Sequence, residues 1–480
     1  MTTASPFFSR FRNHLPGPDI CAGLHEQVIG RDVVIDGQFG PRRMIYADYV
    51  ASGRALQAVE HTMLHEVLPV YANSHTEASY CGAQTSALRH AARARIAALC
   101  GAGAEHAVIF AGSGATAGLN RLVHLLGVRQ AVAAGQGATV LVGPYEHHSN
   151  LLPWRESGAR VVEIAEAPGG GPDLAALEAE LARATGLVIG SFSAASNVTG
   201  ILTDVVAVTR RLKAAGALAV WDYAGGGPYL PIAMRPAPGV DIDAIAASPH
   251  KFAGGPGASG LMIVRRDAVR STVPTFPGGG TVRFVSDEVH DYLPDVVERE
   301  EAGTPNILGD IRAALAFEVK DAVGAGWIAQ RNRELAAQGL AAFAAAPGLR
   351  LLGKTDCPRL PIFSFLVADG EGGFVPPQLA TRLLSDGFGV QARGGCACAG
   401  PYGHRLLGID AATSRATRAA ILAGDEADKP GFVRLNLSYL MPDAEVAAVL
   451  DAVQALPAFA ARHAHRYVWV AASGSYEPLA

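Results

Sequence analysis

One stretch decides how this chain is interpreted: Ser248-Pro249-His250-Lys251-Phe252-Ala253-Gly254-Gly255-Pro256-Gly257. Its single lysine, Lys251, follows a short apolar run and precedes a glycine-rich turn. Burial disfavours the charged form of a lysine, and a neutral amine can attack a carbonyl carbon to form a Schiff base. A surface turn would use the same residue types, so the interpretation depends on what accompanies this stretch elsewhere in the chain.

The composition is that of a folded globular protein. Of 480 residues, 49% are hydrophobic and 18% are charged, and this length suggests two or three domains. The formal net charge of -4 predicts no broad basic surface for nucleic acid. The six cysteines are sparse, and Met1–Ile20 lacks the apolar segment of a signal peptide. No run of about 18 apolar residues is found, so we expect reduced thiols, a cytoplasmic protein and no membrane association.

Short apolar runs alternate with amphipathic segments between residues 85 and 265. Helices are expected at Thr85–Cys100, after a capping Asp173 and at Val205–Ala215, and strands are expected at 107–110, 186–192, 218–222 and 261–264. This alternation predicts a mostly parallel sheet covered on both faces, with ligands at the carboxyl ends of the strands.

The pattern changes after a long helical segment at 307–345, which is expected to break near Gly324. Shorter strands are expected at 361–367, 389–393 and 432–437, with helices at 377–385 and 442–456. The sequence therefore predicts an irregular N-terminal arm over residues 1–40, a large domain over 41–305 and a smaller α+β domain over 306–480. Part of the arm is expected to join the small domain.

Three further features carry chemistry. Gly112-Ser113-Gly114-Ala115-Thr116 follows a strand and opens a helix, where backbone N–H groups can bind a phosphate. His147 follows an apolar pair, and an imidazole there could stack on a ring and move protons near neutral pH. Asp222 ends a strand, where a carboxylate could pair with a protonated ring nitrogen. Singly, an ordinary turn, a loop histidine and a helix cap would explain them.

Together with Lys251, these features resemble the class V aminotransferase family, whose members use pyridoxal 5'-phosphate (PLP). More specifically, they resemble its cysteine desulfurase and selenocysteine lyase branch, over about residues 45–456. Four motifs in family order carry the resemblance: Glu146-His147-His148-Ser149-Asn150-Leu151-Leu152-Pro153-Trp154, Ser196-Asn197-Val198-Thr199-Gly200, Ser248-Pro249-His250-Lys251 and Glu301-Ala302-Gly303-Thr304-Pro305-Asn306. The resemblance implies an α/β protein of PLP-dependent transferase fold type I, with a mostly parallel sheet of the seven-stranded type and a smaller α+β C-terminal domain.

The resemblance also implies roles for residues around the cofactor. Lys251 would carry PLP as a Schiff base and move protons at the substrate Cα. His147 would stack on the ring, and Asp222 would pair with the ring nitrogen. The phosphate would be held by Ala115, Thr116, Ser248 and His250 and, across subunits, by Thr304. A homodimer with an active site shared across the interface is therefore implied.

Asn197 and Arg393 would bind the substrate carboxylate, and the guanidinium fork suits a carboxylate independently of family. Arg393 opens the stretch Arg393-Gly394-Gly395-Cys396-Ala397-Cys398-Ala399-Gly400-Pro401. Cys398 has the spacing of the desulfurase nucleophile, and Cys396 precedes it by two residues. Such a pair also resembles the desulfurase domain of molybdenum cofactor sulfurases. Both cysteines could instead be structural, and a Cys-x-Cys with a distant His404 is too weak to predict a metal.

The function expected from this resemblance is cleavage of the C–S or C–Se bond of a cysteine-type amino acid. Alanine would be released, and an enzyme persulfide would pass its sulfur to an acceptor protein. Two departures weaken cysteine as the substrate: Gly225 stands where desulfurases carry a glutamine, and the cysteine loop enters a long connection over 399–430, a lid or an insertion. An aminotransferase, epimerase or lyase acting on another amino acid is the alternative. A non-catalytic PLP-binding regulator is disfavoured, because it needs no proton shuttle.

Overall fold

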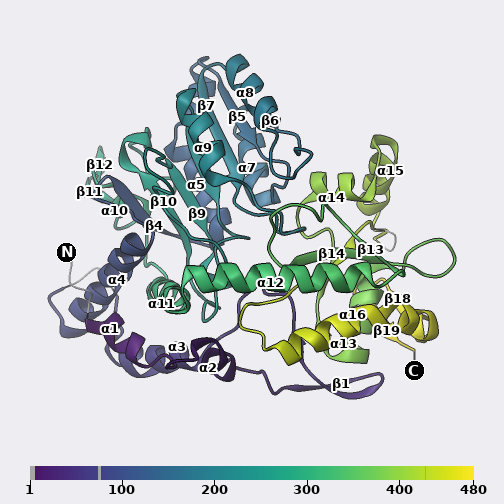
Figure 1. Ribbon diagram of the computed structural model, residues 1–480. Helices are drawn as coiled ribbons and strands as arrows, with labels where there is room; N and C mark the ends of the chain where they lie inside the picture. Colours follow the sequence, from purple (N-terminus) through teal and green to yellow (C-terminus); the bar gives the residue numbers. More distant parts are fainter. Residues whose placement is uncertain (1–5, 74–76, 427–428, 480) are drawn as a thin grey trace. The chain divides into compact units, whose positions relative to one another are not determined.

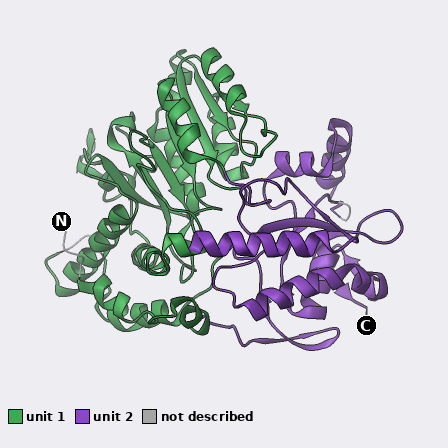
Figure 2. Cartoon of the chain, in the orientation of Figure 1, with its two compact units in different colours: residues 1–27, 52–195, 203–327 green, residues 28–51, 196–202, 328–480 purple. Residues whose placement is uncertain are grey.

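The computed structural model describes residues 6–73, 77–426 and 429–479 (Figure 1). The chain divides into two compact units, coloured separately in Figure 2. Unit 1 comprises residues 1–27, 52–195 and 203–327, and unit 2 comprises residues 28–51, 196–202 and 328–480. The small domain was expected to begin at 306, whereas α11 (Ile307–Val323) belongs to unit 1 because it packs along α4 (Tyr80–Leu99).

Unit 1 is built around a seven-stranded sheet of order β4-β10-β9-β8-β7-β5-β6. Its strands are β4 (His106–Gly112), β5 (Ala138–Val142), β6 (Arg160–Glu163), β7 (Leu187–Ser193), β8 (Leu218–Asp222), β9 (Ala244–Ala247) and β10 (Gly260–Arg265). Neighbours from β9 to β6 are parallel, and β10 is antiparallel to both β4 and β9. The expected mostly parallel, seven-stranded α/β fold is confirmed.

Helices cover this sheet, and α5 packs on β4, β9 and β10 with Leu119 and Leu122 fully buried. The other helices of unit 1 are α1 (Pro6–Asn13), α2 (Ile20–Glu26), α3 (Gln57–Thr62), α6 (Val128–Ala133), α7 (Leu152–Arg155), α8 (Leu174–Arg183), α9 (Val205–Ala214) and α10 (Val296–Glu300), and α5 spans Gly114–Leu125. Short helical turns lie at η1 (Met63–Val67), η2 (Leu68–Val70), η3 (His148–Asn150), η4 (Pro249–Lys251) and η5 (Arg266–Ala268), and a hairpin joins β11 (Val282–Val285) to β12 (His290–Tyr292).

Unit 2 is an α+β unit with a four-stranded sheet of order β13-β14-β17-β16. Its strands are β13 (Leu349–Leu351), β14 (Ile362–Val367), β16 (Arg393–Gly395) and β17 (Phe432–Asn436). Three two-stranded sheets accompany it: β1 (Val34–Gly37) and β2 (Gly40–Arg43), β3 (Ile45–Tyr46) and β15 (Val390–Gln391), and β18 (Tyr467–Val470) and β19 (Ser475–Pro478). Its helices are α12 (Ala325–Ala344, entering from unit 1), α13 (Pro377–Phe388), α14 (Gly400–Leu407), α15 (Ala411–Leu422), α16 (Asp443–His463) and the turn η6 (Ala464–Arg466).

Two helix boundaries predicted from the sequence are confirmed. The side chain of Asp173 caps α8 by accepting hydrogen bonds from the N–H groups of Ala175 and Ala176. The expected break at Gly324 separates α11 from α12, and this glycine has a positive φ of 91°. A positive φ is costly for residues with a Cβ, so the chain ends one helix there and starts another.

The expectation of an irregular N-terminal arm was wrong, and the long connection expected after the cysteine loop is helical in its described part. The arm over 1–40 contains α1, α2 and the β1–β2 hairpin, because Phe7, Phe8 and Phe11 bury one helical face. The connection over 399–430 contains α14 and α15 in its described part. Asp410 caps α15 by accepting from the N–H of Thr413, although no residue of α15 is buried.

Among the described residues, one helical stretch, Asp443–Arg466, is long and apolar enough to span a membrane by length and composition. Its apolar side chains include Val446, Val449, Val453 and Leu456, which are buried in the core cluster of unit 2. The helix therefore has the placement of a core helix.

The core of unit 2 generates a stability prediction. A Cβ at Gly339 of α12 would lie 2.1 Å from the ring of the buried Phe363. Overpacking of this kind costs about 1–3 kcal/mol. Gly339→Ala should lower the free energy of unfolding in urea titrations, against the usual gain from replacing a helical glycine. Gly326→Ala in the same helix meets nothing within 4 Å and is the matched control; equal effects of the two substitutions would contradict the packing argument.

Candidate active site

The carboxyl ends of β4 and β9 meet the start of β10 at one edge of the sheet in unit 1. Gly112 pairs with Gly260, and Ala247 pairs with Leu261, because β10 runs antiparallel between them. A Cβ at Gly260 would lie 2.2 Å from the carbonyl oxygen of Gly114. Only glycine permits this approach, which brings the first turn of α5 to the segment that follows β9.

The first turn of α5 and the segment after β9 form a cradle of polar groups. The N–H of Ala115 donates to Ser248 Oγ at 2.9 Å. Gly114 has a positive φ of 60°, and a Cβ there would lie 3.0 Å from the His250 ring and 3.1 Å from Ser248 Oγ. The N-cap residue of α5, Ser113, makes no side-chain capping hydrogen bond. A helix start with hydroxyl and imidazole groups beside it suits a phosphate group.

Burial controls the charge of His250. Desolvation lowers its pKa to about 4, and the positive charge of the adjacent Lys251 adds to this effect. The imidazole is therefore neutral at physiological pH, and it can donate one hydrogen bond and accept another.

Hydrogen bonds connect this cradle to His147. Thr116 Oγ1 and Ser149 Oγ are 2.7 Å apart, and Ser149 Oγ lies 3.0 Å from His147 Nδ1. His147 Nδ1 also accepts from the N–H of Ser149 at 3.1 Å. Because Nδ1 accepts, the neutral ring carries its proton on Nε2, which fixes the tautomer and orientation of the imidazole.

The loop that carries His147 is anchored by Glu146. Its carboxylate accepts hydrogen bonds from the N–H of Gly143 and from Asn150, and from both the N–H and the hydroxyl of Ser193. Asn150 in turn accepts from Trp154 Nε1 at 3.1 Å. Burial raises the pKa of Glu146 to about 7, and its hydrogen bonds with Ser193 and Asn150 oppose the shift. Glu146, Asn150 and Trp154 of the 146–154 motif therefore anchor the loop, a structural role that the sequence analysis did not predict.

Asp222 lies 3% exposed at the end of β8, and its carboxylate accepts from the N–H of Ala224 at 2.7 Å. Burial raises its pKa, while that hydrogen bond and the charge of Lys251 lower it. Asp222, His250 and Lys251 are thus electrostatically coupled within unit 1. A buried carboxylate of this kind is stabilised by a cationic partner.

The first and last residues of the fourth motif, Glu301 and Asn306, have structural roles. Glu301 forms ion pairs with Arg89 at 2.5 Å and with Arg93 at 2.7 Å, and Asn306 caps α11. Burial would raise the pKa of Glu301, but the two arginines lower it. The hydroxyl of Thr304, by contrast, is exposed and accepts a long 3.5 Å hydrogen bond from Asn73. No contact joins Thr304 to the cradle in the described part of this single chain.

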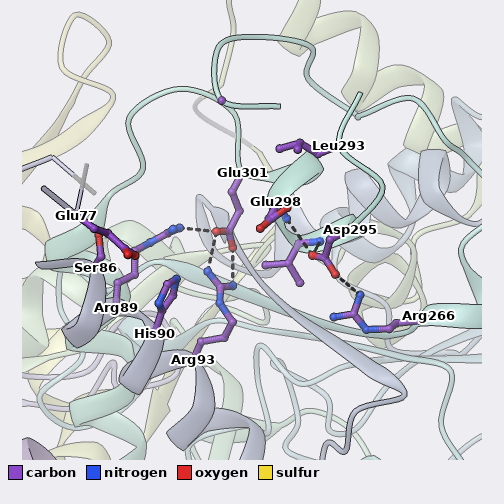
Figure 3. Close-up of a pocket in the computed structure, with 12 residues that line it drawn as sticks. Glu77, Ser86, Arg89, His90, Arg93, Arg266, Leu293, Asp295, Glu298 and Glu301 are labelled. Atoms are coloured by element: carbon purple, nitrogen blue, oxygen red, sulfur yellow. Dashed lines mark hydrogen bonds and ion pairs between the residues drawn. The ribbon is translucent and has the colours of Figure 1, made fainter. Parts of the chain in front are cut away.

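A cavity of about 570 Å³ includes Arg89, Arg93 and Glu301 in its wall. Figure 3 shows these side chains. Arg266 and Asp295, 2.6 Å apart, pair on another part of the wall. Its charges are largely matched in pairs, and none of the predicted site residues lines it. The cavity is therefore separate from the candidate cofactor residues.

Unit 2 positions Asn197 in the tight loop of the second motif. Ser196 Oγ accepts from the N–H groups of Val198 and Thr199, both at 3.1 Å. Asn197 Nδ2 donates to the carbonyl oxygen of Ala397 at 2.8 Å, while its buried Oδ1 has no partner within the described residues. Asn197 thus contacts the predicted cysteine loop directly.

Arg393 belongs to a charged cluster that sequence reasoning did not find. Asp48 Oδ2 accepts from Arg393 Nε at 2.9 Å, and Asp48 Oδ1 accepts from Arg434 NH2 at 2.8 Å. Arg434 is 4% exposed and also donates to the carbonyl oxygen of Asn197 at 3.2 Å. Burial lowers the pKa of Arg434, and Asp48 opposes the shift. Asp48 and Arg434 are 386 residues apart in the sequence, and the strand of Arg434 is buried along its whole length, so no local pattern marked this pair.

The cysteine loop follows β16. Gly394 packs tightly, since a Cβ there would lie 2.7 Å from the carbonyl oxygen of Pro377. Cys396 is partly buried and Cys398 is exposed, and neither forms a disulfide. Cys398 has φ 53°, and the carbonyl oxygen of the preceding Ala397 accepts from Asn197. The Cys398 thiol is therefore accessible on a loop whose backbone is held by a predicted substrate-binding residue. No group of His, Cys, Asp and Glu that could hold a metal ion occurs among the described residues.

The sequence matches the family model for class-V aminotransferases over residues 45–449. The chain belongs to the class-V aminotransferase family. "Probable cysteine desulfurase 2" of Mycobacterium leprae (strain TN) is 32% identical over 343 residues, which cover 70% of this chain and 78% of that relative. "Probable cysteine desulfurase" of Streptomyces coelicolor is 26% identical over 377 residues, 77% of this chain and 87% of the relative.

Solved structures of the family share the fold. An apo cysteine desulfurase from Thermococcus onnurineus NA1 superposes with a TM-score of 0.71 at 24% identity, covering 86% of this chain and 95% of that one. The S-sulfonic acid form of the cysteine desulfurase CsdA from Escherichia coli gives a TM-score of 0.69 at 22% identity, covering 94% and 98%. The expected PLP-dependent transferase fold type I is confirmed.

Glu146 predicts a pH dependence of stability. Its pKa in the folded protein, about 7, lies above the ordinary value of 4.5. The protonated carboxyl therefore contributes stability at low pH that is lost as the pH rises from 4.5 to about 7. Glu146→Gln removes this titration, so the free energy of unfolding of wild type relative to the variant should be larger near pH 5 than near pH 8. Glu156→Gln, at an exposed carboxyl, is the control; an equal change between pH 5 and pH 8 in both variants would contradict the role of Glu146.

The ion pair between Asp48 and the buried Arg434 predicts a loss of stability when the Asp48 charge is removed. Asp48→Asn would leave the buried Arg434 without its counter-charge, which should lower the free energy of unfolding by about 3 kcal/mol. Asp443→Asn breaks the pair with Arg331 at the surface, where Asp443 is 83% exposed, and should cost about 0.5 kcal/mol or less. Similar losses in the two denaturant titrations would refute a buried role for Asp48.

Proposed function

We propose that this protein is a PLP-dependent cysteine desulfurase that removes sulfur from a cysteine-type amino acid and releases alanine. The observation that carries the proposal is the exposed Cys398 on the loop that starts at Arg393, where Asn197 donates to the carbonyl oxygen of Ala397 and Asp48 holds Arg393. The names of the curated relatives support the same activity.

The residues of unit 1 fit PLP. The glycine-lined cradle at Ser248 and His250 would take the phosphate together with Ala115 and Thr116, and Lys251 would be the covalent attachment point. Asp222 would pair with the ring nitrogen and His147 would stack on the ring. Bound there, PLP supplies an electron sink for negative charge at the substrate Cα.

The side chains of this chain would then divide the work of binding and proton transfer. Asp48 holds Arg393 through Nε, so the fork of terminal nitrogens is the part that would bind the substrate carboxylate, with Asn197 beside it. The Lys251 amine would move the proton at the substrate Cα. His147, with its proton on Nε2, would serve as a second proton carrier near neutral pH.

Cys398 would act as the nucleophile, as a thiolate. A bond forms between Cys398 Sγ and the substrate sulfur, and the bond from that sulfur to the substrate β-carbon breaks. The electron pair of the broken bond stays with the carbon fragment, which takes up protons and leaves as alanine. The persulfide on Cys398 would then need a thiol acceptor, which we propose to be a sulfur-acceptor protein. Selenium, which leaves carbon more easily, would make selenocysteine a substrate of the same site.

We further propose a cytoplasmic homodimer in which Thr304 serves the phosphate of the neighbouring subunit. The exposure of Thr304 in the single chain supports this role. A second candidate function rests on Gly225, which has no side chain to bond the ring oxygen. It is an aminotransferase, epimerase or lyase acting on another amino acid, and keto acid, an inverted Cα or an absence of sulfide would identify it.

The nucleophile can be tested by substitution. With cysteine and a reducing thiol, Cys398→Ala should lose sulfide release by about a hundredfold or more, because no persulfide can form. Mass spectrometry of the wild type should find the added sulfur on the Cys396–Cys398 peptide. Cys357→Ala, in the same unit, is the matched control and should keep full activity. If Cys396→Ala abolishes turnover while Cys398→Ala does not, the nucleophile is Cys396.

A further inference from the structure

The turn that follows Asp222 has no polar side chain in its glycine run to hold it. It contains Gly225-Gly226-Gly227, and a Cβ at Gly227 would lie 2.5 Å from the carbonyl oxygen of Tyr223. The turn also sets the position of Asp222, because the Ala224 N–H is a hydrogen-bond donor to its carboxylate. Backbone hydrogen bonds within the turn, from Gly227 to Tyr223 and from Leu230 to Gly226, give it a fold of its own. Glycine-rich backbone has high conformational entropy, so a further tie from outside the turn would restrict it to one conformation.

Lys320 on α11 supplies that tie. Its Nζ donates to the carbonyl oxygen of Gly227 at 2.6 Å and to the carbonyl oxygen of Leu230. The same ammonium lies 5.4 Å from the centre of the Phe252 ring, the residue after Lys251. Phe252 in turn stacks on Phe317 of α11, with ring centres 4.9 Å apart. One amine therefore contacts both segments that carry the proposed cofactor residues.

We propose that Lys320 is a positioning residue that holds the turn after Asp222 and the segment after Lys251 in the arrangement that PLP needs. This inference rests on the proposed function. Lys320 touches no atom of the cradle, and it acts through Gly227, Leu230 and Phe252. It acts as a clamp on a turn whose Gly225–Gly227 run has no side chains of its own.

The surroundings of Lys320 make its charge sensitive to pH. Burial lowers its pKa to about 8, and the negative charge of Asp321 opposes this shift. Cys100 is buried at the end of α4, and burial raises its pKa to about 12. Asp321 is itself paired with Arg12 and Arg95. A neutral amine donates weaker hydrogen bonds than an ammonium, so the clamp weakens as the pH rises through about 8.

The experiment compares PLP binding in Lys320→Met, Lys320→Arg and a control, Lys213→Met. Lys213 pairs with Asp243 in the same unit, outside the turn after Asp222, so its loss should lower thermal stability without changing PLP binding. Lys320→Met should weaken PLP binding by about tenfold or more and displace the visible absorbance band of the bound cofactor. Lys320→Arg should retain both, since a cavity of about 220 Å³ lined partly by Lys320 leaves space for the guanidinium.

A pH series on Lys320→Arg covers the case in which Lys320→Met fails to fold. Wild-type PLP affinity should fall above about pH 8, whereas the variant should lose less, because a guanidinium stays charged. Wild-type binding and absorbance in Lys320→Met, or identical pH profiles in wild type and Lys320→Arg, would overturn the inference. Wild-type protein that binds no PLP would overturn the proposed function itself, which distinguishes the two failures.

Discussion

The close approach of Gly260 to Gly114 is the constraint on which the proposed site in unit 1 depends. Any side chain at Gly260 would collide with backbone atoms, which cannot rotate aside. The contact allows β10 to lie antiparallel between β4 and β9, so that a strand start and two strand ends share one edge. The helix start at Gly114 and the segment at Ser248–Lys251 are neighbours for this reason, before any side-chain chemistry is considered.

Burial favours the neutral forms of the ionisable groups near that edge. Desolvation is the largest cause of the shifts at Glu146, Asp222 and His250, and each shift favours the neutral form. The proposed cofactor would bring an anionic phosphate and a ring nitrogen that can carry a proton. These opposite charges would favour the charged forms of the buried groups and so counteract the effect of desolvation. This is a physical reason for the site to fit the cofactor. The Asp48 cluster in unit 2 differs, because its arginines are balanced by a carboxylate of the chain itself.

The sequence identified what local signals and contiguous motifs encode. The cap at Asp173, the break at Gly324 and the buried run of β9 are read from adjacent residues, and the four motifs led directly to the fold. The partnership of Asp48 with Arg434 and the clamp at Lys320 join residues distant in the chain, so a single sequence does not reveal them.

The arm was missed for a different reason. Phe7, Phe8 and Phe11 form too short an apolar pattern to predict a helix alone, and burial of these rings within unit 1 stabilises α1. The helix α15 was missed because it buries no residue at all, so its sequence lacks the apolar periodicity by which helices are recognised.

The backbone at Ala397 and Cys398 has a consequence for sulfur delivery. Both residues adopt left-handed conformations, with φ of 50° and 53°, and each costs roughly 1–2 kcal/mol for a residue with a Cβ. A peptide stored in this state releases that energy when it extends. The hydrogen bond from Asn197 to the Ala397 carbonyl oxygen helps to hold this state. Relaxation of the main chain would therefore offset part of the cost of releasing a loaded thiol toward an acceptor.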